Sequence, residues 1–232
     1  MNILITGAGS GIGRALALRL GTVAADSCEL AITGRNKTKL TETSAMLHRP
    51  PLIIPADLTC ANQQDILESN IRLRFDGSLD LLILAAGVHS RMPVGTDPWL
   101  QSLSKNLGIL NTNLTANVSL IERMYPFLKA AHGMVIHINS VAAKNMCPDE
   151  AAYSASKHGM SGYLKALRYE ARQHGVRVLD VILGAVNTPL YTGTVDSGKL
   201  MDANDVASAI THVISPFATL QIEELQLGRT IV

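Results

Sequence analysis

The sequence has little of what marks several classes of protein. Its three cysteines, Cys28, Cys60 and Cys147, are odd in number and widely spaced, so neither a disulfide scaffold nor a metal site is expected. The simplest interpretation is reduced thiols in a cytoplasmic protein. Only 17% of the residues are charged, the formal net charge is +1, and no lysine- and arginine-rich run stands out. A nucleic-acid partner therefore has no electrostatic support.

Long apolar runs and linker segments are also missing. The apolar stretch Leu79–Val88, interrupted by Asp80 and Gly87, is too short to span a bilayer and suits a buried strand. The first expected strand begins next to Met1, which leaves no room for a signal peptide, so no membrane partner is expected. Because no Pro-, Gly- or Ser-rich linker and no internal repeat divides the chain, residues 1–232 are expected to form one domain.

Short apolar runs alternate with longer amphipathic stretches along the whole chain. The expected strands are Asn2–Thr6, Glu29–Thr33, Leu52–Pro55, Leu79–Leu84, Met134–Asn139, Val176–Leu183 and Leu220–Leu227. The expected helices are Ile12–Leu20, Lys37–Leu47, Asn62–Arg72, Leu110–Ala131, Ala151–His174 and Ala203–Ile214. Continuous apolar strands are typical of strands buried on both faces. The pattern predicts a doubly wound, Rossmann-type α/β fold with a parallel sheet of about seven strands and helices on both faces.

A glycine-rich segment, TGAGSGIG, follows the first expected strand directly. Gly7, Gly11 and Gly13 lie between that strand and the first helix, with the spacing Gly-x-x-x-Gly-x-Gly. Glycines permit a tight turn and let the backbone approach a pyrophosphate, and the following helix offers its N–H groups. The alternative is a turn that needs glycine for backbone reasons alone. Position between strand and helix favours a dinucleotide site.

The residues at the ends of the second and third strands indicate which dinucleotide the site binds. No carboxylate stands at Gly34, where one would accept the ribose hydroxyls of NAD, and Arg35 follows instead. A guanidinium matches a phosphate bidentately, so NADP(H) is preferred, with NAD(H) possible and a solvated Arg35 as the alternative. Asp57 is expected either to bind the adenine amino group or to cap the next helix.

The chemical centre is expected around Tyr153, Lys157 and Ser140. Tyr153 and Lys157 are spaced i, i+4 and therefore share one face of a helix. A free tyrosine has a pKa of about 10, and a nearby ammonium lowers it toward the range useful for acid–base catalysis. Ser140 ends the fifth expected strand, where it can donate a hydrogen bond to a substrate oxygen.

Taken together, these motifs resemble the short-chain dehydrogenase/reductases, in their compact single-domain branch, over nearly the whole chain. The segments that match the family's motifs are TGAGSGIG, NTNLTAN, HINSVAAKNMCPDEAAYSASK and LGAVNTP. The resemblance implies that Tyr153 exchanges the proton, Lys157 holds the nicotinamide ribose and lowers the tyrosine pKa, Ser140 orients the carbonyl, and Asn113 anchors a water relay. It implies cofactor contacts at Gly7, Gly9, Ser10, Gly11, Ile12, Gly13, Arg35, Asp57, Leu58, Ala85, Ala86, Gly87, Tyr153, Lys157, Gly184, Val186 and Thr188.

The chain departs from the family pattern in places. The family's Asn-Asn-Ala-Gly appears as Leu84-Ala85-Ala86-Gly87, so the side-chain amides that brace the sheet there are missing. The usual Pro-Gly after the sixth strand is Leu183-Gly184. Asn106 competes with Asn113 for the asparagine role.

The leading hypothesis is an NADP(H)-dependent oxidoreductase that interconverts a ketone or aldehyde and an alcohol. A cofactor-binding sensor on the same fold is the main alternative. A sugar-nucleotide epimerase or dehydratase would need a substrate domain, for which Pro189–Val232 is too short. The substrate is expected to contact Val88–Gly95, Ala142–Pro148 and Tyr191–Lys199. The two long helices Leu110–Ala131 and Ala151–His174 are expected to pack against a second copy, as a homodimer or homotetramer.

Overall fold

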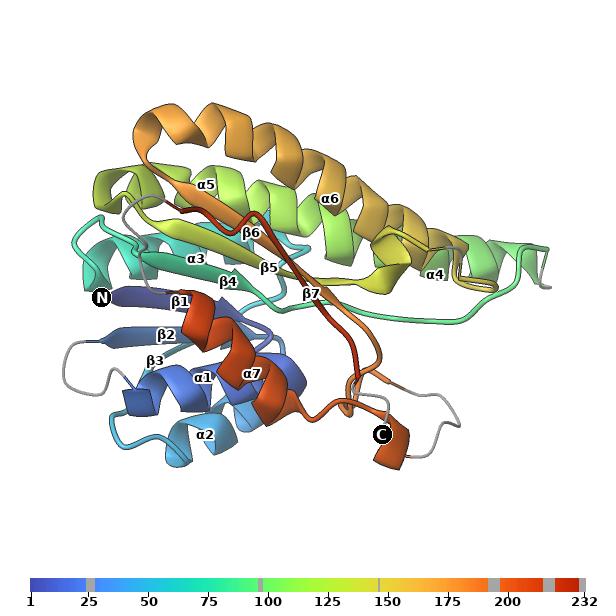
Figure 1. The fold of residues 1–232 in the computed structure, drawn as a ribbon, viewed down its shortest axis with the longest axis horizontal. Helices are drawn as coiled ribbons and strands as arrows, with labels where there is room; N and C mark the ends of the chain where they lie inside the picture. Colours follow the sequence, from blue (N-terminus) through green and yellow to red (C-terminus); the bar gives the residue numbers. More distant parts are fainter. Residues whose placement is uncertain (24–27, 96–97, 146, 192–196, 215–219, 230–232) are drawn as a thin grey trace.

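A seven-stranded parallel sheet forms the centre of the molecule (Figure 1). The computed structural model describes residues 1–23, 28–95, 98–145, 147–191, 197–214 and 220–229. The strands are β1 (Asn2–Thr6), β2 (Glu29–Gly34), β3 (Leu52–Pro55), β4 (Leu81–Leu84), β5 (Met134–Ser140), β6 (Arg177–Leu183) and β7 (Glu224–Leu227). Their order is β3-β2-β1-β4-β5-β6-β7. Successive strands are added on one side of β1 up to β3 and on its other side from β4 onward, so the strand order reverses between β1 and β4. The predicted doubly wound α/β fold is confirmed.

Helices cover both faces of the sheet. The helices are α1 (Gly11–Val23), α2 (Lys37–Ala45), α3 (Ala61–Arg74), α4 (Trp99–Leu110), α5 (Ala116–Ala131), α6 (Ala151–Ala171) and α7 (Ala203–Val213). In Figure 1, α1, α2 and α7 lie on one side of the sheet, and α3, α5 and α6 lie on the other. Alternate residues of each strand point to the two faces: Ile3 and Ile5 pack with α1 and α7, whereas Leu4 packs with the opposite layer.

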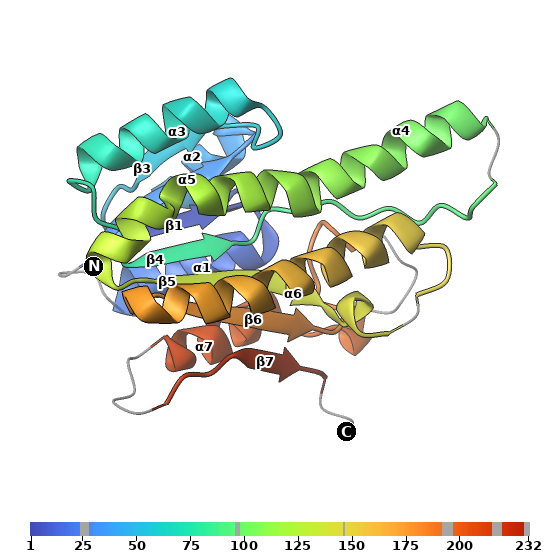
Figure 2. The ribbon, with the colours of Figure 1, turned by 90° about the horizontal axis from the view of Figure 1, so that it is seen from above.

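The predicted elements are largely confirmed, and the differences have physical causes. The last strand is shorter than expected because only Glu224–Leu227 pairs with β6. The predicted helix Leu110–Ala131 belongs to a longer helical rod in which α4 runs through a π-helical turn, Asn111–Thr115, into α5. Figure 2 shows α4 projecting beyond the sheet at the end of this rod. Within the described part of the chain, no helix is both long and apolar enough to cross a bilayer.

Candidate active site

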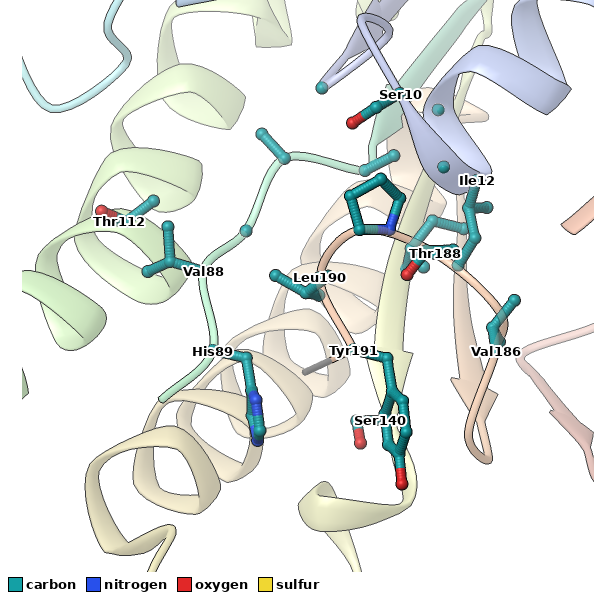
Figure 3. A pocket seen from close by; sticks show the side chains of 18 of the residues that line it. Ser10, Ile12, Val88, His89, Thr112, Ser140, Val186, Thr188, Leu190 and Tyr191 are labelled. Atoms are coloured by element: carbon teal, nitrogen blue, oxygen red, sulfur yellow. The ribbon is translucent and has the colours of Figure 1, made fainter. Parts of the chain in front are cut away.

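A cavity of about 710 Å³ opens at the carboxyl ends of the strands, across the point where the strand order reverses. Parallel α/β sheets bind their ligands at this point. Figure 3 shows Ser10 from the loop after β1, Ile12 from the start of α1, Thr188 from the loop after β6, and Ser140 around the cavity. Of the catalytic and cofactor-binding residues predicted from the sequence, all line the cavity except Asn113. The segments expected to contact the substrate contribute Val88, His89, Arg91, Ala142, Cys147 and Tyr191 to its wall, whereas Met146 and residues 192–196 lie outside the described residues.

The glycine loop, Gly7–Gly13, forms one end of the cavity and fits a dinucleotide diphosphate. Gly7 and Gly11 have φ angles of +67° and +54°, which disfavour other residues. A Cβ on Gly7 would lie 2.8 Å from the backbone of Ala85 and Ala86. Helix α1 begins at Gly11, so its unpaired N–H groups lie at the cavity. Volume, backbone shape and helix end together provide a cradle of the size and polarity that such a group needs.

Arg14, which sequence reasoning did not single out, holds this loop in place. Its Nη2 donates to the carbonyl oxygen of Gly9 at 2.6 Å, and its Nε donates to Thr43 Oγ1 at 3.0 Å. These bonds join the glycine loop to α2. The contact crosses between elements about thirty residues apart, so no local pattern in the sequence reveals it.

The turn after β4 shows how the missing family asparagines are replaced. Thr6 Oγ1 accepts hydrogen bonds from the N–H groups of both Ala85 and Ala86, each at 3.1 Å. Asn113 then clamps Val88: its Oδ1 accepts from the Val88 N–H and its Nδ2 donates to the Val88 carbonyl, both at 2.8 Å. The turn is therefore braced by side chains from β1 and from the π-helical turn.

Asn113 is fully buried and lies behind the wall of the cavity. Besides holding Val88, its Nδ2 donates to Ser156 Oγ at 3.2 Å, and its backbone carbonyl accepts from Asn117. Asn106 is on α4 and does not line the cavity. The structure thus places Asn113, rather than Asn106, against the turn next to Gly87.

Arg35 and Asp57 line the cavity just after the ends of β2 and β3. The side chain of Arg35 is exposed, and the ion pairs found among the described residues do not include it. Asp57 Oδ1 accepts from the N–H and hydroxyl of Thr59, which lower the pKa of this carboxyl. The next helix, α3, has Cys60 at its N-cap, so the alternative that Asp57 caps this helix is wrong.

Tyr153 and Ser140 meet at the other end of the cavity. Tyr153, on α6, is 8% exposed, and it lines the cavity together with Ser140 at the end of β5. Burial raises the pKa of Tyr153 above 10, the side chain of Ser140 opposes this shift, and the charge of Glu150 adds to it. The phenol therefore keeps its proton at neutral pH.

Lys157 lies one helical turn beyond Tyr153, and its surroundings differ from the expectation. Its Nζ donates to the carbonyl of Ile138 at 3.0 Å and lies 5.7 Å from the centre of the Tyr153 ring. Burial lowers the pKa of Lys157 to about 8, and the charge of Asp180 partly offsets this. The pKa of Tyr153 lies above its ordinary value because burial of the phenol is the largest effect, and the lowering expected from Lys157 stays a prediction.

His89 and Arg91, from the segment Val88–Gly95 that was expected to contact the substrate, both line the cavity. The His89 ring packs edge-to-face on Tyr153, with ring centres 4.7 Å apart. His89 Nε2 and Arg91 Nε lie 3.1 and 3.0 Å from the same oxygen of Glu150, whose side chain is largely buried. Glu150 directly precedes α6, and this cluster forms the wall of the cavity beside Tyr153.

Comparison with known proteins identifies the family. The family model for short chain dehydrogenases matches residues 1–197. The chain belongs to this family. It is therefore an oxidoreductase, and the resemblance carried by the glycine loop and by Tyr153 and Lys157 is confirmed.

Individual members of the family match almost the full chain. A sepiapterin reductase of Chlorobaculum tepidum is 30% identical, with 98% of this chain and 96% of that protein covered. A dehydrogenase/reductase SDR family protein 7-like of Anopheles gambiae is also 30% identical, with 92% of this chain and 71% of that protein covered. Among solved structures, the alcohol dehydrogenase of Thermococcus sibiricus complexed with 5-hydroxy-NADP has a TM-score of 0.85 at 19% identity and covers 100% of this chain and 99% of that one. This structure shows that the fold is shared.

Proposed function

We propose that this protein is an NADP(H)-dependent oxidoreductase that interconverts a ketone or aldehyde and an alcohol in one domain spanning residues 1–232. The observation that carries the proposal is that Tyr153, Ser140 and the buried Lys157 line the same cavity as the glycine cradle. The names of the relatives support it, since they include a sepiapterin reductase and an alcohol dehydrogenase complexed with a modified NADP.

Each proposed role follows from the position of the side chain. Bound nicotinamide would supply or accept the hydride. Tyr153 keeps its proton at neutral pH, so it can give that proton to the substrate oxygen in reduction and take it back, as phenolate, in oxidation. Ser140 lines the cavity together with Tyr153 and orients the same oxygen. Lys157 lies where its ammonium can bind ribose hydroxyls, and Asn113 holds the turn at Val88 that borders the substrate.

The proposed cofactor contacts cover the length of the cavity. The glycine loop and the start of α1 hold the diphosphate. Asp57 and Leu58 would border the adenine, Ala85–Gly87 would lie beside the ribose, and Gly184, Val186 and Thr188 would border the nicotinamide, since all of them line the cavity. A Cβ on Gly11 would meet Thr188 at 3.1 Å, so the loop after β6 closes directly over the glycine loop.

Replacing Arg35 with alanine is expected to erase most of a preference for NADPH over NADH. Arg35 lines the cavity, and the loss of a charge-assisted bond to the 2′-phosphate costs on the order of 1.5–3 kcal/mol, about ten- to a hundred-fold in affinity. Fluorescence titration with both cofactors measures this. Lys37→Ala is the matched control, because Lys37 is exposed nearby but does not line the cavity. Equal affinity of the unmodified protein for NADPH and NADH would contradict the assignment.

We also propose a homodimer or homotetramer, on an apolar surface that differs from the one expected. Among the described residues, the exposed large apolar side chains of the helical rod lie on α4: Leu100, Leu103 and Leu107, between 46% and 63% exposed. None lies on α5. Their spacing of three and four residues makes one continuous stripe on α4.

Light scattering should therefore show a dimer or tetramer at micromolar concentration. Leu103→Lys combined with Leu107→Lys should reduce the mass to that of a monomer, because burial of two unpaired charges in a subunit interface costs free energy. Leu73→Lys, on an exposed leucine of α3, should leave the assembly intact. A monomeric unmodified protein at high micromolar concentration would refute the proposal.

A cytoplasmic location is also proposed, in keeping with three cysteines that are all free.

The test of the proposed function is a panel of ketones, aldehydes and alcohols assayed for loss or gain of NADPH absorbance. Turnover of a carbonyl compound with NADPH supports the proposal. Tight NADPH binding without turnover of any member of a broad panel would instead favour the sensor hypothesis.

A further inference from the structure

A cluster of buried polar side chains lies between the sheet and α6, next to the candidate site. His137 and Asn139 on β5 and Asp180 on β6 are between 1% and 3% exposed. On β5 they alternate with Ile136 and Ile138, and on β6 Asp180 lies between Leu179 and Val181. These four apolar side chains face the opposite layer, so the polar ones point toward α6. Figure 2 shows α6 running over β5 and β6. The interface between helix and sheet is apolar along Leu164 and Leu167 but polar near the carboxyl ends of the strands.

Asp180 is the centre of this cluster. His137 Nδ1 lies 3.0 Å from its Oδ1, and its Oδ2 accepts bonds from Ser161 Oγ at 2.6 Å and Asn139 Nδ2 at 2.9 Å. Burial alone would raise the pKa of Asp180, but these donors outweigh it and the pKa lies below its ordinary value. Burial lowers the pKa of His137, so the imidazole is neutral. The cluster therefore carries one buried negative charge, on Asp180.

The cluster is connected to both Ser140 and Lys157. Asn139 Oδ1 accepts the backbone N–H of Ser140 at 2.9 Å, and its Nδ2 lies 3.4 Å from the backbone oxygen of Lys157. Lys157 Nζ binds the carbonyl of Ile138, the residue between His137 and Asn139. Ser161 follows Lys157 by one helical turn on α6. Asp180 thus joins, through one carboxylate, the strand that bears Ser140 and the helix that bears Lys157.

We propose that Asp180 is a positioning residue that supplies the buried counter-charge for Lys157 and fixes α6 against β5 at Ser140. The proposal rests on the proposed function, in which Lys157 acts as a cation. A buried ammonium is strongly disfavoured without a compensating charge. The titratable groups around Lys157 in the described structure are Tyr153 on its own helix, His137 on β5 and Asp180 on β6, and only Asp180 is an anion at neutral pH.

The first test measures the dissociation constant of NADPH against pH by fluorescence. In the unmodified protein the affinity should fall above pH about 8, where Lys157 loses its proton. Asp180→Asn keeps the shape of the side chain and removes the charge, so the fall should begin about one pH unit lower. Ser161→Ala is the matched control: it removes one bond to the same carboxylate but keeps the charge, and the pH midpoint should not move. An unchanged midpoint in Asp180→Asn would overturn the proposal, even if affinity fell by the same factor at every pH.

The second test needs no cofactor and separates this proposal from the proposed function. The urea midpoint is measured for Asp180→Asn, Lys157→Met and the double variant. With Lys157 present, Asp180→Asn leaves a buried cation unpaired, whereas in the Lys157→Met background it removes an unpaired anion. Asp180→Asn should therefore lower the urea midpoint more when Lys157 is present than when Met replaces it. If Asp180→Asn alone does not fold, the addition of Lys157→Met should restore folding. An equal loss in both, or failure to fold in both, would overturn the role of Asp180. Absence of NADPH binding by the unmodified protein would refute only the proposed function.

Discussion

Replacing Tyr153 with phenylalanine should lower the turnover rate by about 10²- to 10⁴-fold while leaving the fold and NADPH affinity nearly unchanged. The substitution removes one hydroxyl and keeps the ring that packs against His89. The loss follows from the role of the phenol as the group that exchanges a proton with the substrate oxygen. Steady-state kinetics with any accepted substrate measure the rate, and fluorescence titration measures the affinity.

Tyr125→Phe is the control for this experiment, because Tyr125 on α5 bonds His174 far from the cavity and its loss should leave the rate within about twofold. The pH dependence adds a second check. Since the pKa of Tyr153 lies above 10, alcohol oxidation, which needs the phenolate, should accelerate as pH rises through the alkaline range. A Tyr153→Phe variant that works at near-normal speed would eliminate the proposed mechanism.

Lys157→Met should abolish function and stabilise the fold at the same time. The variant loses the cation proposed to bind ribose, so cofactor affinity and rate should fall together. The pKa of Lys157 is about 8 in the folded chain, against 10.5 for an exposed lysine. At neutral pH the folded state therefore carries an ammonium that burial disfavours. Its removal should raise the free energy of unfolding by about 1–3 kcal/mol, because the pKa of Lys157 is lowered even with the attraction of Asp180 included.

The sign of this effect gives it a characteristic pH dependence. Between pH about 8 and 10.5 the folded state of the unmodified protein binds fewer protons than the unfolded state, so its stability rises with pH. The loss of folding stability caused by charged Lys157 is complete below pH 8 and disappears above pH 10.5. Urea unfolding of both proteins at pH 7 and pH 10 measures the difference between them, which should shrink as pH rises. A variant that is less stable than the unmodified protein at pH 7 would show that the buried lysine stabilises the fold.

The fold and the centre of the site could be predicted because their signals are local. The glycine loop, the apolar strands and the i, i+4 spacing of Tyr153 and Lys157 each lie within one short segment. Three further features depend on contacts between distant segments: the Thr6 bonds to Ala85 and Ala86, the approach of His89 to Glu150, and the Asp180 cluster.

The direction of the Tyr153 pKa shift could not be predicted for the same reason. Spacing on a helix brings Lys157 near the tyrosine, but the shift is decided by burial, which depends on how β5 and the loop after β4 close over α6. The contact with a second copy was likewise assigned to Leu110–Ala131 and Ala151–His174, because no helix was predicted over Trp99–Leu110. Its exposed leucines follow from the projection of α4 beyond the sheet.

The most direct test of hydride transfer at this site uses NADPH with deuterium at C4 of the nicotinamide and the carbonyl substrate that the panel identifies. Mass spectrometry of the alcohol should find one deuterium on the carbon that bears the new hydroxyl, formed far more slowly by Tyr153→Phe. An alcohol formed without deuterium from either face of the labelled cofactor, or NADPH bound with no transfer to any carbonyl compound, would contradict the account.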